Sequence, residues 1–264
     1  MEERLRRAER LEGGSREVST EALLLRSRTG DRYRIVAHES GLLVYNLSTG
    51  GDPLRVPVDA PAPVLVAGDS IAAGVPYNGG VPWSARLTLP GVVNVALGGQ
   101  GWFAKPTYFI PRPEFVETVL ASLPAETVII SGGTNDVGQL VSEGKTAHQV
   151  RDLLAEKITS DIETMHEHGL RVYLTTIWPV GSPDTFDGFL TDDSLLPAFR
   201  EAIQATNEWL REDQGHRLFD LDPVVSTDEG WMRPEYDWID HVHPLPAADL
   251  PVASLVDREL GFLG

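Results

Sequence analysis

The stretch Val64–Ser70 reads VLVAGDS, a short apolar run followed by a small turn that carries a serine. An apolar run of this length, without polar alternation, predicts a strand over residues 64–67 that is buried on both faces of a sheet. In α/β sheets ligands bind at the carboxyl ends of the strands, so a serine in this turn is well placed to meet a ligand. A serine hydroxyl becomes a nucleophile only with a base, a group that orients the base, and donors for the oxyanion that forms.

Four further apolar runs follow and alternate with helical patterns. The predicted strands cover residues 92–95, 127–130, 171–176 and 217–220. Apolar residues at i, i+3 and i+4 spacing predict helices over 147–168 and 195–213, with Thr146 placed to cap the first helix and Gly169 to end it. The alternation indicates an α/β fold, a three-layer α/β/α sandwich around a five-stranded parallel sheet.

The first part of the chain has a different pattern. After a charged lead over residues 1–12, expected to be mostly helical, β-like runs cover 21–25, 33–37 and 42–46, with 54–57 as a candidate fourth. Glycine and aspartate in the intervening segments suit tight turns and predict a small β-meander. The sequence DAPAP at 59–63 predicts a boundary, so we expect a lead and β-unit over residues 1–60 and a second domain over residues 61–264.

Charge and composition exclude several classes of function. The formal net charge of -17 at pH 7 argues against nucleic acid or an anionic membrane surface as a partner. The absence of cysteine excludes disulfides, thiolate nucleophiles and thiolate metal sites. The charged N-terminus does not have the pattern of a signal peptide, and no apolar run approaches the length of a membrane span, so we expect a cytoplasmic protein with a small-molecule or carbohydrate partner. These totals leave the oligomeric state open.

Residues suited to catalysis follow the predicted strands. A glycine-rich bend extends from Asn94 to Gly101, Asn135 lies after the strand at 127–130, and Asp240 and His243 lie near the C-terminus. Each feature alone is common as a turn, a helix cap or a local hydrogen bond. Together at one edge of a sheet they would supply a nucleophile, backbone donors, a side-chain amide and a carboxylate–histidine pair.

Four blocks resemble those of the SGNH (GDSL-type) hydrolases: Gly68-Asp69-Ser70, Asn94 to Gly99, Gly133-Thr134-Asn135-Asp136, and Asp240-His241-Val242-His243. The resemblance extends from Val64 to the C-terminus and implies a flavodoxin-like sheet and serine esterase activity without a cofactor or a metal. It further implies that Ser70 is the nucleophile, His243 the general base and Asp240 the residue that orients the base. The same resemblance places the oxyanion between the backbone N–H groups of Ser70 and Gly99 and the side-chain amide of Asn135.

Some positions depart from the family pattern or need a separate interpretation. His241 lies two residues before His243 and could itself be the base or a ligand, but the family spacing of three residues from Asp240 falls on His243. The family often has a glycine where this chain has Ala96. We expect Asp69 and Asp136 to bind nearby backbone amides and to take no direct part in catalysis.

Aromatic residues bear on the substrate. Trp102, Trp178 and Trp238 are expected near the catalytic edge, where they would either contact substrate or cover the rim of the core. Substrate contact would favour a sugar ring or an aryl ester. A β-domain ahead of the Gly-Asp-Ser block is similar to that of certain carbohydrate deacetylases, which favours removal of an acetyl or another short acyl group from a sugar or small-molecule alcohol.

Other functions stay open at this level. The same triad could serve a longer-chain lipase, a lysophospholipase, a thioesterase or an acyltransferase. A more remote alternative is a metal-dependent hydrolase. Its ligands would be Asp237, Asp240, His241 and His243, with a contribution from Asn135 and Asp136. An α/β-hydrolase is disfavoured because its serine follows several strands, whereas Ser70 follows the first strand of the α/β part. A non-enzymatic binding module would be expected to have lost at least one of the catalytic positions.

Overall fold

The computed structural model of this chain describes residues 23–26, 32–38, 41–46, 54–56, 64–74, 81–89, 91–103, 125–182, 193–238 and 240–263. The chain divides into two compact units, Met1–Asp59 and Ala60–Gly264, and each is described here by itself. The helical lead expected over residues 1–12 and the proline-rich boundary at 59–63 lie outside the described residues.

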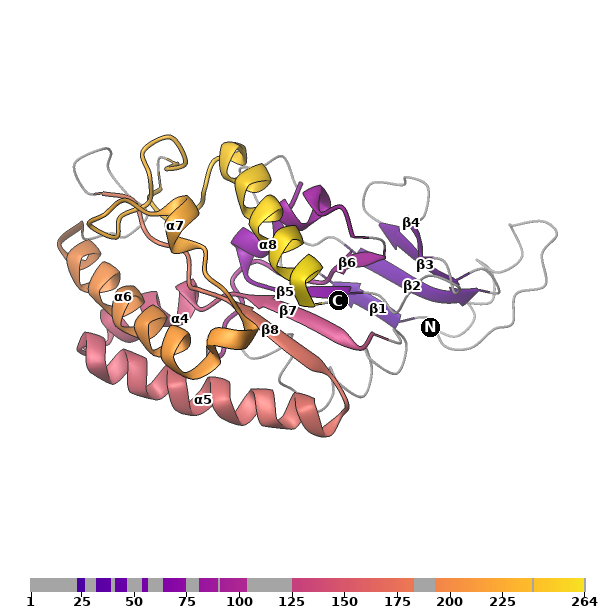
Figure 1. The fold of residues 1–264 in the computed structure, drawn as a ribbon, viewed down its shortest axis with the longest axis horizontal. Coiled ribbons are helices and arrows are strands. Elements are labelled where there is room, and N and C mark those ends of the chain that lie inside the picture. The colour runs from indigo at the N-terminus through magenta and orange to yellow at the C-terminus, as the bar shows by residue number, and fades with distance from the viewer. Residues whose placement is uncertain are drawn as a thin grey trace. The chain divides into compact units, whose positions relative to one another are not determined.

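The first unit contains an antiparallel sheet in the order β1-β2-β3-β4. Its strands are β1 (Leu23–Arg26), β2 (Arg32–His38), β3 (Gly41–Asn46) and β4 (Leu54–Val56) (Figure 1). Strands β2 and β3 pair from Tyr33 opposite Asn46 to His38 opposite Gly41, which leaves a two-residue hairpin connection. The predicted β-meander is therefore confirmed, and the candidate fourth run forms its last strand, β4.

The second unit is built on a five-stranded sheet whose strands are all parallel. The strands are β5 (Val64–Gly68), β6 (Val92–Asn94), β7 (Thr127–Ser131), β8 (Arg171–Thr175) and β9 (Leu218–Phe219). Their spatial order is β6-β5-β7-β8-β9, so the first strand of this unit lies between the second and the third. This is the flavodoxin-like order, and the point between β5 and β7 is the switch point where such sheets bind ligands.

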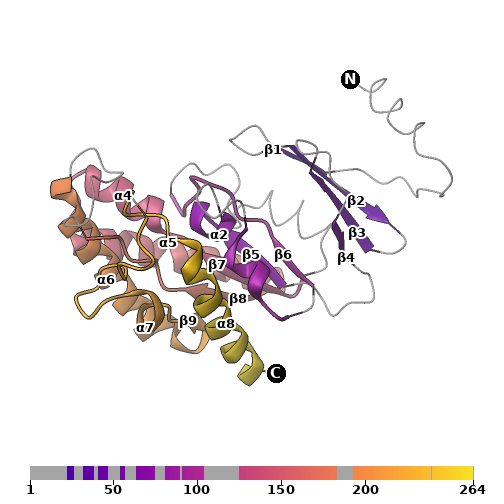
Figure 2. The same ribbon diagram turned by 90° about the horizontal axis from the view of Figure 1, so that it is seen from above.

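Helices cover both faces of this sheet, as predicted (Figures 1 and 2). Helices α4 (Thr134–Ser142), α5 (Ala147–Glu167) and α6 (Leu196–Gln214) pack together on one face. The other face carries α8 (Asp249–Leu263), which packs against the short 3-10 helix η1 (Trp83–Arg86). Helix α5 begins with a capping box in which the Thr146 side chain accepts from the Gln149 N–H and the Gln149 side chain accepts from the Thr146 N–H.

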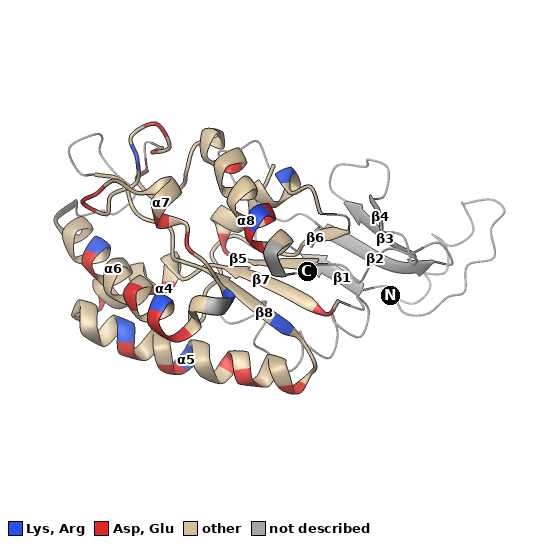
Figure 3. Cartoon of the chain, in the orientation of Figure 1, with Lys and Arg blue, Asp and Glu red and all other residues tan. Residues whose placement is uncertain are grey.

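The core of this unit lies on the sheet. Strand residues Leu65, Val66, Val128 and Ile129 are fully buried, and residues of α8 such as Val252 and Val256 are buried on the face that Val66 and Ile129 share. Charged residues lie along α5, α6 and α8, whereas β5 and β7 carry none (Figure 3). Among the described residues, no helix is both long and apolar enough to cross a membrane.

Candidate active site

Ser70 is held at the carboxyl end of β5 by its neighbours. Gly68 has φ +151, and a Cβ atom there would lie 1.8 Å from the carbonyl oxygen of Ser131 on β7, so only glycine fits. Asp69 is the N-cap of the short helix α2 (Ser70–Ala73), and its carboxylate accepts a hydrogen bond from the Ile71 N–H at 3.0 Å. The strand therefore ends abruptly, and Ser70 stands at the first position of a helix beside the switch point of the sheet.

Ser70, His243 and Asp240 form a continuous chain of hydrogen bonds. The Nε2 atom of His243 lies 2.7 Å from Oγ of Ser70, and its Nδ1 atom lies 2.7 Å from Oδ2 of Asp240. The other carboxylate oxygen, Oδ1, accepts from the backbone N–H groups of Val242 at 3.0 Å and His243 at 2.9 Å. The Asp240 carboxylate can only accept a hydrogen bond, so Nδ1 of His243 must be the donor. A neutral His243 therefore carries its proton on Nδ1 and presents the Nε2 lone pair to Ser70.

The environment of Asp240 favours its charged form. Burial acts to raise its pKa, but the hydrogen bonds from the His243 ring and from the two backbone N–H groups outweigh burial and lower the pKa below its usual value. Asp240 is therefore an anion at neutral pH and can stabilise a positive charge on the imidazole ring.

The glycine-rich turn after β6 passes beside Ser70. The Leu97 N–H donates to the carbonyl of Gly68 at 3.0 Å, and a Cβ atom on Gly98 would lie 3.7 Å from Cβ of Ser70. Gly99 has φ +75, a left-handed conformation that favours glycine. The side-chain amide of Asn135 donates to the carbonyl of Gln100 at 2.8 Å, which ties the start of α4 to the same turn. The structure thus brings the Gly99 turn, Asn135 and Ser70 to one edge of the sheet.

Two aspartates hold this edge through backbone amides, as predicted for Asp69 and Asp136. Burial raises the pKa of Asp69 to about 6, although the Ile71 hydrogen bond and the nearby His243 act in the opposite direction. The fully buried carboxylate of Asp136 accepts from the N–H groups of Trp102 at 2.8 Å and Phe103 at 2.6 Å. These partners are more than thirty residues away in sequence, so Asp136 connects helix α4 to a loop that is distant in the sequence.

Asn94, the first residue of the second block, connects three segments through the hydrogen bonds of its side chain. Its amide nitrogen donates to the carbonyl of Ala72 and to Oγ of Ser84, both at 2.7 Å, and its oxygen accepts from the Ala96 N–H at 2.9 Å. One side chain therefore joins the serine helix, the η1 segment and the start of the glycine turn. The Ala96 departure from the family pattern is accommodated, because Ala96 is buried and its N–H is bonded to Asn94.

The second histidine of the C-terminal block has a different partner. Nδ1 of His241 lies 3.0 Å from Oδ2 of Asp237, and both side chains are almost completely buried. The two histidines therefore contact separate carboxylates. Within the described part of the chain, no group of three or more His, Asp or Glu side chains could hold a metal ion. Sequence reasoning missed the Asp237–His241 pair, although the i, i+4 spacing of these residues was a signal for it.

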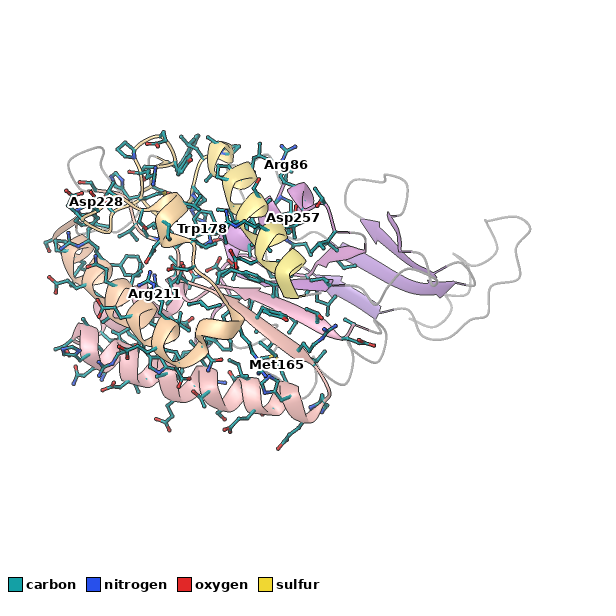
Figure 4. The ribbon with its side chains drawn as sticks, in the orientation of Figure 1. Arg86, Met165, Trp178, Arg211, Asp228 and Asp257 are labelled. Carbon is teal, nitrogen blue, oxygen red and sulfur yellow. The ribbon has the colours of Figure 1, made fainter. Side chains whose placement is uncertain are left out.

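The three tryptophans do not share one environment. Trp178 is 2% exposed, and its Nε1 donates to Oγ of Ser131 at 3.3 Å. It belongs to the core cluster that includes Val225 of α7 (Asp222–Val225) and Val252 of α8 (Figure 4), so its interpretation as a substrate contact is corrected. Trp102 is also buried, at 4% exposed, and only Trp238 is partly exposed.

The sequence profile of the GDSL-like lipase/acylhydrolase family matches residues 66–248, more than half of the chain. This chain belongs to that family. It is a serine ester hydrolase of the SGNH superfamily, with the α/β fold that the sequence predicted. The matched residues include Ser70, Asn135, Asp240 and His243, and so cover the hydrogen-bonded chain described above.

Solved structures share the fold of this GDSL-like hydrolase at low sequence identity. A GDSL-like lipase from Bacteroides thetaiotaomicron is 20% identical with a TM-score of 0.56, covering 80% of this chain and 93% of that one. A carbohydrate acetylesterase from Sinorhizobium meliloti is 17% identical with a TM-score of 0.54, covering 77% of this chain and 100% of its own. The aryl esterase of M. smegmatis is 19% identical with a TM-score of 0.51, and the match covers 77% of this chain and 100% of that one. No curated protein matched the hydrolase by sequence.

Proposed function

We propose that this hydrolase removes an acetyl or another short acyl group from a sugar or a small-molecule alcohol through an acyl-Ser70 intermediate. The observation that carries the proposal is the 2.7 Å contact between Oγ of Ser70 and Nε2 of His243. Serine is activated when its hydroxyl is hydrogen-bonded to an imidazole and a carboxylate holds that imidazole in place. In this proposal residues 61–264 carry the whole esterase, and no cofactor takes part.

In the first half of the reaction, Oγ of Ser70 attacks the ester carbonyl carbon while its proton passes to Nε2 of His243. The anionic Asp240 stabilises the imidazolium that results. The carbonyl oxygen becomes an oxyanion, for which we assign the backbone N–H groups of Ser70 and Gly99 and the amide of Asn135 as donors. The Asn135 bond to Gln100 supports this assignment, because it fixes the direction of the amide before substrate binds.

The tetrahedral intermediate then collapses and the alcohol leaves with the proton from Nε2, which completes the first half. This step breaks the ester C–O bond and leaves the acyl group on Oγ of Ser70. In the second half, a water molecule gives a proton to the same nitrogen and attacks the acyl carbon. Collapse of the second intermediate returns the proton to Oγ and releases the carboxylic acid, so both halves use His243 as base and then as acid.

The choice of a short acyl group has two supports. One neighbour in fold is named a carbohydrate acetylesterase, a name that specifies an acetyl group, and another is named an aryl esterase, a name that specifies an aryl group. The antiparallel sheet β1–β4 precedes the hydrolase unit, an arrangement similar to that of certain carbohydrate deacetylases. The partly exposed Trp238 is our candidate for contact with the flat face of such a substrate.

The proposal is tested with p-nitrophenyl esters from acetyl to palmitoyl and with acetylated sugars, for the parent and for Ser70→Ala. We expect the highest kcat/KM on acetyl or another short chain, acetate release from at least one sugar, and loss of nearly all activity in Ser70→Ala. Ser142→Ala, which changes an exposed serine on α4, is the matched control and should keep full activity.

Other outcomes point to specific alternatives. A preference for palmitoyl over acetyl esters would contradict the short-acyl hypothesis and favour a lipase, a lysophospholipase or a thioesterase. Transfer of the acyl group to an added sugar in preference to water would identify an acyltransferase. Full activity in Ser70→Ala would overturn the serine mechanism itself.

A further inference from the structure

His241 has an unusual backbone conformation in the middle of the catalytic block. Its φ is +57, and it is the only non-glycine residue with a positive φ in the described part of the chain. It lies directly between Asp240 and the Val242 N–H that the Asp240 carboxylate binds. A side chain with a Cβ atom pays a free-energy cost in this left-handed region, so the surrounding structure must hold His241 there.

The anchor is a buried pair with Asp237. The exposed fractions of the His241 and Asp237 side chains are 0% and 2%, and their Nδ1 and Oδ2 atoms lie 3.0 Å apart. The backbone of His241 is held at the same place, because its carbonyl accepts from the Gly181 N–H at 2.8 Å. A Cβ atom on Gly181 would lie 2.2 Å from Oδ2 of Asp237, so the segment after β8 lies directly against the carboxylate.

Asp237 also closes the loop that carries the catalytic residues. It forms an isolated antiparallel bridge with Pro244, and the Leu245 N–H donates to the Tyr236 carbonyl at 2.6 Å. Asp240 and His243 both lie within this closed loop. The loop is thus fixed at its base by the bridge and at its midpoint by His241.

We propose that Asp237 and His241 are a positioning pair that holds the loop in the one conformation in which Asp240 and His243 align with Ser70. The inference rests on the proposed function of Ser70 and His243. The pair lies outside the reacting chain, because the His241 ring contacts Asp237 and the His243 ring contacts Asp240 and Ser70. Its role is to keep Nε2 of His243 at hydrogen-bond distance from Oγ of Ser70, and an error of about 1 Å there costs about 100-fold in rate.

Three substitutions at His241 separate its side chain from its backbone. His241→Ala removes the anchor and keeps the strain of a positive φ. His241→Gly removes both the anchor and the strain. His241→Asn keeps the anchor, because the amide of Asn occupies the position of Cγ and Nδ1 of His, and Asn adopts the left-handed region readily.

The experiment measures kcat and KM on p-nitrophenyl acetate, the rate of covalent labelling by a fluorophosphonate, and the Tm, with rates normalised to folded protein by circular dichroism. We expect His241→Ala and His241→Gly to lower both kcat and the labelling rate about 10- to 100-fold, with KM within about threefold of the parent. His241→Asn should restore kcat to within about threefold. Gly181→Ala, which displaces Asp237, should resemble His241→Ala.

Thr146→Ala is the matched control for stability. It removes the hydroxyl that caps α5, far from the catalytic loop in sequence, and should lower the Tm without changing kcat. Parental kcat and labelling rate in His241→Gly, with only the Tm lowered, would overturn the proposal, and so would failure of His241→Asn to restore kcat. A different result would mean that the proposed function itself has failed: Ser70→Ala keeps its activity, and the fluorophosphonate does not label the parent protein. If His241→Ala does not fold, the Gly and Asn variants decide.

Discussion

The carboxylate of Asp136 accepts a hydrogen bond from the backbone N–H of Trp102 at 2.8 Å, which ties helix α4 to the turn that carries Gly99. A Cβ atom on Gly101 would lie 2.4 Å from the same carboxylate. Asp136 thus sets the position of a backbone segment that we assign to the oxyanion.

Asp136→Asn should lower both stability and kcat. The substitution replaces one carboxylate oxygen by an N–H group that faces a backbone donor, which leaves a buried N–H unpaired at a cost of about 1–3 kcal/mol. We expect the Tm to fall and kcat to fall about tenfold as the turn shifts. Thermal unfolding and initial rates on p-nitrophenyl acetate measure both effects. Asp152→Asn, at an exposed position on α5, is the control, and equal kcat in all three proteins would contradict the role of Asp136.

Asn135→Ala should act on the chemical step. The amide of Asn135 is oriented by its bond to Gln100, and loss of one oxyanion donor typically lowers kcat about 100- to 1,000-fold. KM should change little, because the donor acts on charge that develops in the transition state. Steady-state rates separate the two parameters. An increase in KM with an unchanged kcat would assign Asn135 to ground-state binding.

Asp69→Asn should stabilise the protein, and more so at high pH. The pKa of Asp69 is raised to about 6 in the folded chain, so between its usual value of 3.8 and 6 the folded state holds a proton that the unfolded state has lost. Stability therefore falls as the pH rises through this window, by about 2–3 kcal/mol in total. An Asn side chain at this position still accepts the hydrogen bond from the Ile71 N–H, so it caps helix α2 without carrying a charge.

Urea unfolding of the parent and Asp69→Asn at pH 4 and pH 8 measures this difference. The gain from Asn should be larger at pH 8 than at pH 4. Equal gains at the two pH values would show that Asp69 titrates near its ordinary value in the folded chain. Activity is recorded in parallel, because Asp69 adjoins Ser70.

Trp178→Phe should affect stability and leave substrate preference unchanged. The side chain is 2% exposed and packs in the core, and its removal frees Oγ of Ser131 and leaves a small cavity. We expect a loss of about 1–3 kcal/mol in the free energy of unfolding. The ratio of kcat/KM between acetyl and butyryl esters should stay that of the parent. A changed ratio would return Trp178 to the substrate site.

Thr146→Ala should lower stability by about 1 kcal/mol without an effect on kcat. The substitution removes the hydroxyl that accepts from the Gln149 N–H at the start of α5. Denaturant unfolding measures the loss, and initial rates check the activity. Thr164→Ala, within the same helix and partly exposed, lacks a capping role and should change stability less. A comparable loss in both variants would show that the cap contributes nothing specific.

The sequence predicted the parallel sheet because its strands are apolar throughout and end in turns with distinctive residues. Strand β5 and helix α5 were located to within one residue. Gly68 marks the end of β5, and the Thr146 cap marks the start of α5. Helix α8 was missed. Proline usually ends a helical pattern, but Pro251 lies in the first turn of α8, where proline is tolerated, and Val252, Leu255 and Val256 then repeat at helical spacing.

Residues that act through distant partners were harder to predict. The family blocks located Ser70, Asn135 and His243, but the bonds from Asp136 to Trp102 and Phe103 depend on a close approach that no local pattern encodes. The burial of Trp178 followed from tertiary packing rather than from its position after a strand. The Asp237–His241 pair had a spacing signal, which the neighbouring Asp240–His243 pair obscured.

The sequence separation of 173 residues from Ser70 to His243 has a consequence for synthesis. At a ribosomal rate of about 5–20 residues per second, roughly 9–35 s pass between the addition of the hydroxyl and that of its imidazole. During that interval the nascent polypeptide contains a serine without its base, and it cannot acylate itself from the esters around it. Reactivity therefore arises only after all five strands of the parallel sheet have been synthesised.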